Sequence, residues 1–334
     1  MITASLLDAQ PARWQNDWRE CVTDPLELLR LLDLEHRLPQ MMVPAPGEFP
    51  LRVPRAFIAR MRRGDPRDPL LRQVLPLDAE RETVEGHGHD AVGDLASREA
   101  AGVLHKYAGR ALLIATGSCA IHCRYCFRRH FPYAREGAAA DRWQTAIAWL
   151  REATDIEEVL LSGGDPWSLS TLRLHELTDA LRELPHVRRL RVHTRLPVVL
   201  PARVDAALLD WVRGLHLPLA VVLHSNHAAE LDASTAQAFA RLRGAGATLL
   251  NQSVLLRGVN DDGEVLARLS EALYEQGVLP YYLHQLDRVA GAAHFAVDDG
   301  TARNLLAHLR ARLPGYLVPR LVREVEGAPY KVPL

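Results

Sequence analysis

Lysine is almost missing from this chain of 334 residues, because only Lys106 and Lys331 occur among its 40 basic residues. The other 38 basic residues are arginines. A lysine that remains is therefore a candidate for chemistry that a guanidinium cannot perform, such as attack by a neutral amine. Chance retention is the alternative explanation for either lysine.

Cysteine and long apolar runs are also scarce. Four cysteines are too few for a disulfide scaffold, and Cys21 lies far from the other three, where we expect an incidental buried thiol. No apolar run approaches the roughly 20 residues that cross a bilayer, and the first residues do not resemble a secretory signal. A net charge of −1 gives no overall attraction for nucleic acid or an anionic membrane. These features predict a cytoplasmic protein without nucleic-acid or membrane partners.

Short apolar runs alternate with helical patterns six times after residue 110. This alternation predicts a parallel sheet covered by helices. No glycine-rich dinucleotide fingerprint follows the first strand, which favours a partial (β/α)6 barrel over a Rossmann sheet. The predicted strands are 111–116, 158–163, 189–194, 218–225, 247–256 and 279–286, and the predicted helices are 141–153, 170–183, 202–213, 229–243, 262–276 and 299–312.

Two regions follow from this pattern. Residues 1–104 are expected to form a mostly helical N-terminal extension, with helix-like runs at 25–34 and 55–63. Residues 105–334 are expected to form the barrel and a C-terminal segment that carries Lys331. In barrels of this kind the chemistry takes place at the C-terminal ends of the strands, so the motifs that follow strands are the candidates for function.

Three cysteines, Cys119, Cys123 and Cys126, directly follow the first predicted strand with the spacing C-x3-C-x2-C. Thiolates at this spacing can converge on an iron–sulfur cluster or a metal ion. Three ligands would leave one iron of a four-iron cluster open to a substrate or cofactor. The alternative is a zinc site with His122 or His130 as the fourth ligand, although zinc motifs usually contain two short pairs.

The cysteine triplet, the aromatic Phe127 and a Ser-Gly-Gly-Asp-Pro turn after the second strand together resemble the radical S-adenosylmethionine superfamily. The resemblance implies that the three cysteines bind a [4Fe-4S] cluster whose open iron binds S-adenosylmethionine. It also implies that the turn contacts this cofactor, since glycines let the backbone approach a ligand and a carboxylate suits an ammonium group. The turn residues in question are Ser162, Gly163, Gly164 and Asp165.

A more detailed resemblance, from about residue 105 to residue 331, is to the lysine 2,3-aminomutase family. These enzymes add pyridoxal phosphate to the radical cluster, and the resemblance implies that Lys331 is the catalytic lysine that binds this cofactor. An amine can bond covalently to the cofactor aldehyde, whereas arginine cannot. The matching blocks are HKYAGRALL, CAIHCRYCFRRHF, LLSGGDP, RVHTRLPVVLP, LHSNH, NQSVLLRGVND, PYYLHQLD and GAPYK.

The same resemblance implies roles for eight further residues, and several have simpler alternatives. It places Lys106, Tyr107 and Arg110 at the cofactor phosphate, His224 and Gln252 at S-adenosylmethionine, Arg128 at the substrate carboxylate, and Asp287 and Glu324 at the substrate ε-ammonium. The first group could instead be a solvated basic patch, and the histidine and glutamine could be ordinary polar groups of the core or rim. Free-lysine enzymes carry aspartate where this chain has Glu324, which could also be an exposed charge.

The resemblance implies an L-lysine 2,3-aminomutase, an isomerase that converts L-α-lysine into β-lysine. Only three residues follow Lys331, which resembles the bacterial branch that makes β-lysine for translation elongation factor P. In that branch a separate ligase attaches the product, and an electron donor such as flavodoxin or ferredoxin is expected. The alternatives are a catabolic free-lysine 2,3-aminomutase, a radical enzyme without pyridoxal phosphate and a zinc-stabilised binding protein.

Overall fold

The computed structural model describes residues 13–36, 49–136 and 143–334. Its centre is a ten-stranded sheet in which the strands follow one another in chain order. Strands β3 to β9 run parallel, while β1, β2 and β10 pair antiparallel at the two edges. The strands are β1 (Arg98–Ala100), β2 (Val103–Tyr107), β3 (Arg110–Thr116), β4 (Glu158–Gly163), β5 (Arg189–Thr194), β6 (Leu219–Leu223), β7 (Thr248–Val254), β8 (Leu279–His284), β9 (Arg320–Arg323) and β10 (Val332–Pro333).

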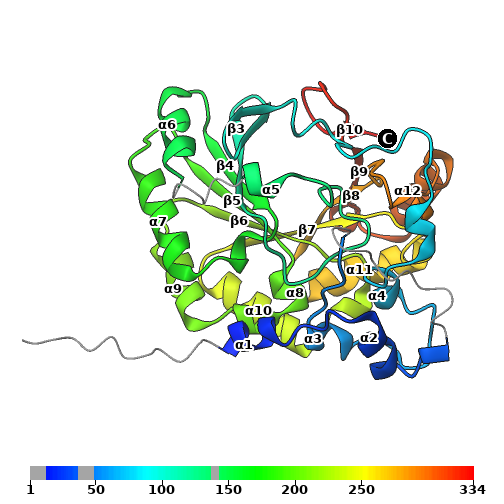
Figure 1. The fold of residues 1–334 in the computed structure, drawn as a ribbon. Coiled ribbons are helices and arrows are strands. Elements are labelled where there is room, and N and C mark those ends of the chain that lie inside the picture. The colour runs from blue at the N-terminus through cyan, green and yellow to red at the C-terminus, as the bar shows by residue number, and fades with distance from the viewer. Residues whose placement is uncertain (1–12, 37–48, 137–142) are drawn as a thin grey trace, which may run out of the picture.

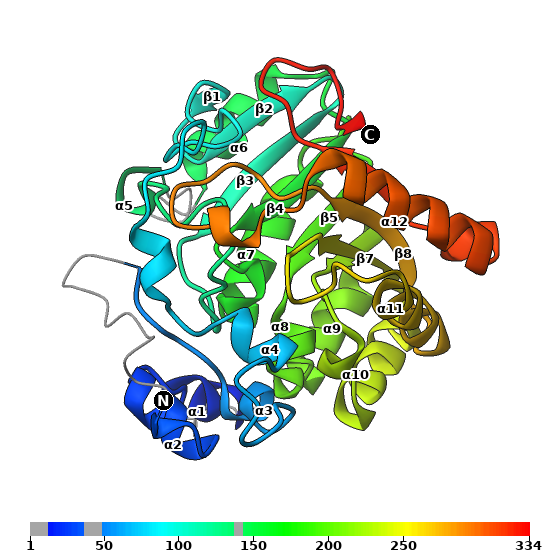
Figure 2. The same ribbon diagram turned by 90° about the vertical axis from the view of Figure 1, so that its right-hand side faces the viewer.

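Helices cover the outer face of this curved sheet (Figures 1 and 2). Each strand from β3 to β8 is followed by at least one helix, which confirms the predicted partial (β/α)6 barrel. The helices are α1 (Arg13–Arg19), α2 (Pro25–Leu31), α3 (Arg55–Ile58), α4 (Pro69–Arg72), α5 (Tyr133–Glu136), α6 (Gln144–Glu152), α7 (Thr171–Arg182), α8 (Leu196–Val199), α9 (Ala206–Gly214), α10 (Ala233–Gly244), α11 (Gly263–Glu275) and α12 (Asp299–Arg312).

Side chains along each strand point alternately outward to the helices and inward to the barrel, as the pleat requires. In β5, Leu190 and Val192 are buried in the apolar core, whereas Arg191 and His193 line the barrel interior. The inner face of β5 is therefore polar, although its outer face is buried in the apolar core. This alternation places strand residues in position to contact a ligand without loss of the outer apolar core.

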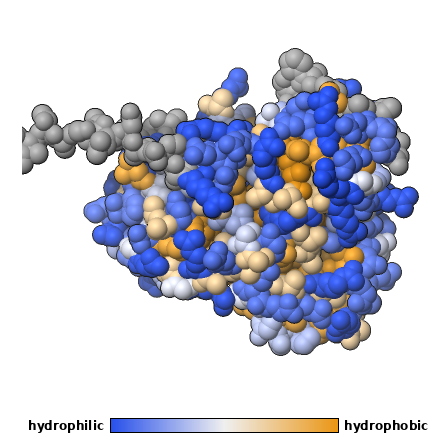
Figure 3. Space-filling model, turned by 90° about the horizontal axis from the view of Figure 1, so that it is seen from below, coloured by the Kyte–Doolittle hydropathy of each residue, from blue (hydrophilic) through white to orange (hydrophobic). Residues whose placement is uncertain are grey.

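The N-terminal extension lies against the C-terminal ends of the strands. Helices α1, α3 and α4 contact α8 and short 3-10 helices that follow β5 and β6. Phe57 of α3 and Val74 after α4 belong to the same apolar core as Leu161 of β4. The face seen from below Figure 1 carries apolar residues interspersed with hydrophilic ones (Figure 3).

The first edge of the sheet differs from the sequence expectation. We expected Lys106 and Tyr107 to precede the first strand, but they lie in β2, which forms an antiparallel hairpin with β3. A short turn with Gly109 at φ +74° joins the two strands. The predicted division between residues 104 and 105 stays a prediction. Within the described ranges, no helix is both long and apolar enough to span a bilayer.

Candidate active site

A cavity of about 1100 Å³ occupies the barrel interior and reaches the C-terminal ends of the strands. Its wall includes every site residue that the sequence predicted, although these residues are spread from position 106 to position 331. The lining residues from that prediction are Lys106, Tyr107, Arg110, Cys119, Cys123, Cys126, Arg128, Ser162, Gly163, Gly164, Asp165, His224, Gln252, Asp287, Glu324 and Lys331.

The cysteine triplet forms one part of this wall. Cys119, Cys123 and Cys126 are free thiols on the loop after β3. Burial, the nearby Asp165 carboxylate and the neighbouring thiols raise the pKa of Cys119, whereas burial and the Cys123 thiol raise that of Cys126 to about 11. Three soft sulfur donors together on one cavity wall fit an iron–sulfur cluster. In the part of the chain that the structure describes, no three His, Cys, Asp or Glu side chains are grouped so as to hold a single metal ion.

Residues of the N-terminal extension hold the cysteine loop in place. The Nε of the fully buried Arg124 donates to Oε1 of Glu80 at 2.8 Å. Arg129 donates from Nη2 to the other oxygen of the same carboxylate at 2.7 Å. The backbone N–H of Arg124 also donates to the carbonyl of Gln73 at 2.9 Å. These arginines within the cysteine motif therefore have a structural role, with a partner more than 40 residues away in sequence.

The Gly-Gly-Asp turn after β4 packs directly on the start of the cysteine loop. A Cβ atom on Gly164 would come within 2.5 Å of the carbonyl oxygen of Ser118, and Gly163 adopts φ +110°. The N–H of Gly164 donates to the carbonyl of Thr116 at 2.7 Å. The glycines thus allow a close approach between two backbone segments, and an approach of the same turn to a ligand stays a prediction.

The Asp165 carboxylate is occupied by partners within the protein. It accepts from Thr194 Oγ1 at 2.7 Å and from the backbone N–H groups of Trp167, Arg195 and Leu196 at 2.7–3.1 Å. Asp165 therefore joins the ends of β4 and β5. A contact between this carboxylate and a cofactor ammonium stays a prediction.

Polar side chains at four adjacent strands, β5 to β8, also line the cavity. Nδ1 of His193 is 3.3 Å from Nε2 of His224, and burial lowers the pKa of His224 to about 4. Nε2 of His193, Nε2 of His284 and Oε1 of Gln252 are buried and have no protein partner. Such groups carry a cost unless a ligand or water satisfies them. They fit a polar ligand inside the barrel.

Lys331 and two carboxylates form the charged part of the cavity. Nζ of Lys331 pairs with Oε2 of Glu324, whose side chain is 10% exposed. Burial raises the pKa of Asp287 to about 7, and the nearby Lys331 opposes this shift while Glu324 adds to it. The predicted acid pair therefore already faces an ammonium group, that of Lys331.

A further acid, Asp94, connects two of the predicted cations, Arg128 and Lys106. Nε of Arg128 is 2.6 Å from Oδ2 of Asp94, and Nζ of Lys106 is 2.7 Å from Oδ1. Burial opposes ionisation of Asp94, but Arg128 and Lys106 outweigh it and lower its pKa. Nη1 of Arg128 donates to Oγ of Ser162 at 3.0 Å, and Tyr107 donates to Oε1 of Glu324 at 2.6 Å. Several side chains that were predicted to bind a ligand are thus hydrogen-bonded to other residues of the site.

Sequence reasoning missed Asp94, Glu80, His193 and Arg195 as parts of this region. Nη1 of Arg195 lies 2.7 Å from Sγ of Cys123. Arg195 belongs to the block RVHTRLPVVLP, which was the one signal that could have directed attention to it and to His193. Asp94 and Glu80 lie in a loop-rich stretch that offers no comparable signal.

Known proteins resemble this chain over nearly its whole length. It is 48% identical to the L-lysine 2,3-aminomutase of Escherichia coli over 96% of this chain and 94% of that protein. The protein of the same name from Haemophilus influenzae is 42% identical over 95% and 94%, and that from Clostridium subterminale is 32% identical over 98% and 79%. Among solved structures, a radical SAM methyltransferase from Sphaerobacter thermophilus aligns with a TM-score of 0.46 and 18% identity over 66% and 68% of the chains. No family model matches the chain.

The fold and the site define a partial-barrel protein with a large cavity that is lined by a cysteine triplet, a lysine and several other charged side chains. The relatives specify this class further. The chain belongs to the L-lysine 2,3-aminomutase family of isomerases.

Proposed function

We propose that this chain is an L-lysine 2,3-aminomutase that moves the α-amino group of L-lysine to the β-carbon. The observation that carries the proposal is the pairing of Lys331 with Glu324 beside Asp287, inside the cavity that the cysteine triplet also lines. This arrangement offers a lysine amine for a cofactor and an acid pair that accommodates an ammonium group. The names and identities of the relatives support the same reaction.

The cavity wall divides into regions that suit three cofactors. Cys119, Cys123 and Cys126 would hold a [4Fe-4S] cluster. Lys331 would bind pyridoxal phosphate, with Lys106, Tyr107 and Arg110 near its phosphate, and Ser162, Gly163, Gly164, Asp165, His224 and Gln252 would surround S-adenosylmethionine. When bound, the cluster and S-adenosylmethionine supply hydrogen-atom abstraction and pyridoxal phosphate carries the migrating nitrogen.

Substrate selection rests on charge. Glu324 and Asp287 attract the ε-ammonium of lysine, whereas the side-chain carboxylate of a glutamate would be repelled from the same place. Arg128 binds the substrate carboxylate, since its guanidinium offers paired donors, while Asp94 and Ser162 hold it in position. Positioning of the substrate within the cavity is the protein's main contribution.

We place the enzyme in the cytoplasm, in the branch that makes β-lysine for elongation factor P. The identity to relatives named L-lysine 2,3-aminomutase supports the reaction that both branches share, with 48% to the Escherichia coli protein and 32% to the Clostridium subterminale protein. A separate ligase would then use the product, and flavodoxin or ferredoxin would supply electrons. A catabolic free-lysine aminomutase is the alternative. Transfer of the product to elongation factor P by a lysyl-transferring ligase would favour the first role over the catabolic one.

Anaerobic turnover tests the proposal. Cluster-reconstituted protein with pyridoxal phosphate, S-adenosylmethionine and dithionite is given L-lysine, and the products are resolved by chiral chromatography. We expect β-lysine from the natural chain, and the Lys331→Ala variant should lose both turnover and the pyridoxal absorbance. A loaded enzyme that makes no β-lysine would refute the substrate assignment. A pyridoxal band that survives in Lys331→Ala would refute the role of that lysine.

A further inference from the structure

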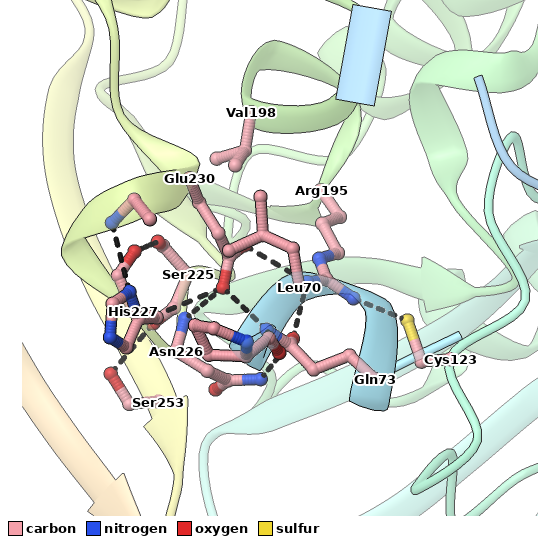
Figure 4. Close-up of polar contacts among 12 residues, drawn as sticks. Leu70, Gln73, Cys123, Arg195, Val198, Ser225, Asn226, His227, Glu230 and Ser253 are labelled. Carbon is pink, nitrogen blue, oxygen red and sulfur yellow. Dashed lines mark hydrogen bonds and ion pairs between the residues drawn. The ribbon is translucent and has the colours of Figure 1, made fainter. Parts of the chain in front are cut away.

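Arg195 reaches from the end of β5 to the cysteine loop, and the roles proposed above do not use it. Its guanidinium is 6% exposed, and Nη1 lies 2.7 Å from Sγ of Cys123 (Figure 4). Nη2 donates to Oε1 of Gln73 at 2.7 Å and to Oε2 of Glu230 at 2.9 Å. One end of the guanidinium is therefore anchored, and the other is directed at a sulfur atom.

The anchor is itself rigidly held. Glu230 is fully buried, and its Oε1 accepts from the backbone N–H groups of Asn226 and His227 at 2.9 and 3.1 Å (Figure 4). Nε2 of Gln73 donates to the same oxygen at 3.1 Å. Because Gln73 follows α4 and Glu230 lies in the 3-10 helix after β6, segments far apart in sequence fix the direction of Arg195.

The ion pair with Glu230 is enough to compensate the burial of the Arg195 charge. It does not explain why Nη1 of Arg195 is directed at Sγ of Cys123. A hydrogen bond from a cation to a thiolate is charge-assisted, and it stabilises negative charge on sulfur. Reduction of an iron–sulfur cluster adds one electron to a centre with thiolate ligands, and hydrogen bonds to sulfur are among the factors that set its potential. A donor fixed at Cys123 therefore favours the reduced state.

We propose that Arg195 is a positioning residue for the iron–sulfur cluster. Arg195 donates a hydrogen bond to Sγ of Cys123 and thereby raises the reduction potential of the cluster. This proposal rests on the proposed function, because it requires that the cysteine triplet holds the cluster. The step concerned is a one-electron reduction by a protein donor or dithionite, in which no bond to Arg195 forms or breaks. The role concerns the ease of reduction rather than contact with lysine.

The test compares reduction potentials of reconstituted full-length proteins by redox titration with electron paramagnetic resonance detection. Arg195→Gln should show about a tenfold lower ratio of reduced to oxidised cluster at a fixed potential, equivalent to about 59 mV for a one-electron couple. Arg195→Lys retains the charge and should fall between this variant and the natural chain. Arg60→Gln is the matched control, since Arg60 donates to the backbone of Glu230 and Val198 in the same network. Its potential should match that of the natural chain.

Iron and sulfide content and the visible spectrum are measured for each protein first. A natural chain that binds no cluster would refute the proposed function itself. A natural chain with a cluster and an Arg195→Gln variant of equal potential would refute only the role of Arg195. If Arg195→Gln does not retain a cluster, the comparison passes to Arg195→Lys, and an unshifted potential there would overturn the proposal. An equal shift in Arg60→Gln would also overturn it, because the effect would then belong to the packing of the network.

Discussion

Replacement of Asp287 by asparagine is expected to stabilise the chain at pH 8 and to leave its stability nearly unchanged at pH 4. Burial raises the pKa of this carboxyl from 3.8 to about 7 in the folded protein. A carboxyl with a raised folded-state pKa contributes its stability below pH 4 and loses it as the pH rises to about 7. A difference of about three pKa units corresponds to about 4 kcal/mol at 1.36 kcal/mol per unit.

The assay is urea unfolding of the full-length chain without cofactors or lysine at several pH values. The difference in free energy of unfolding between Asp287→Asn and the natural chain should grow from near zero at pH 4 to about 4 kcal/mol at pH 8. Glu324→Gln is the contrasting control. Burial raises the pKa of Glu324, but the opposite effect of Lys331, Tyr107 and Lys106 is larger, so the net shift is downward. This variant should lose stability at neutral pH and recover as the pH falls below about 4.5. A pH-independent difference for Asp287→Asn would refute the reasoning.

Three further predictions concern the support of the site. Glu80→Gln leaves Arg124 and Arg129 without their shared carboxylate and should cost about 3–5 kcal/mol by urea unfolding, whereas Glu27→Gln in an exposed pair should cost under about 1 kcal/mol. Gly164→Ala should cost about 1–3 kcal/mol because its Cβ would meet a backbone oxygen, while Gly214→Ala meets open space and should cost less. In turnover assays, Glu324→Gln should raise KM for lysine by at least about tenfold, because hydrogen bonds to charged groups contribute about 1.5–3 kcal/mol; an unchanged KM would contradict the role of Glu324.

The repeating part of the fold could be predicted from sequence with good accuracy. The predicted strand 158–163 coincides with β4, and the predicted helix 299–312 coincides with α12. Both carry strong local patterns, because one face of each element is buried against the same core. The strand 111–116 was predicted and corresponds to β3, but its hairpin partner β2 and the short strands β1, β9 and β10 were missed, since short strands carry too few residues to show a period.

In the site, too, features that lie within a short stretch of sequence could be predicted, whereas contacts between distant stretches could not. Motifs identified the residues that line the cavity, because the residue types and spacings lie within short blocks. Motifs did not reveal that Arg128 pairs with Asp94 or that Arg124 pairs with Glu80, because these partners lie 34 and 44 residues apart in sequence. Pairings of this kind depend on how the chain folds back on itself, which periodicity does not report.

The packing of residues 13–36 and 49–100 on the strand ends has a consequence for engineering. Phe57 shares its core with the barrel, Gln73 contacts Arg195, and Glu80 neutralises Arg124. An exchange of this segment between relatives would have to carry these partners across as matched sets. The segment is therefore not a detachable module, because its side chains are among those that fix the conformation of the cysteine loop.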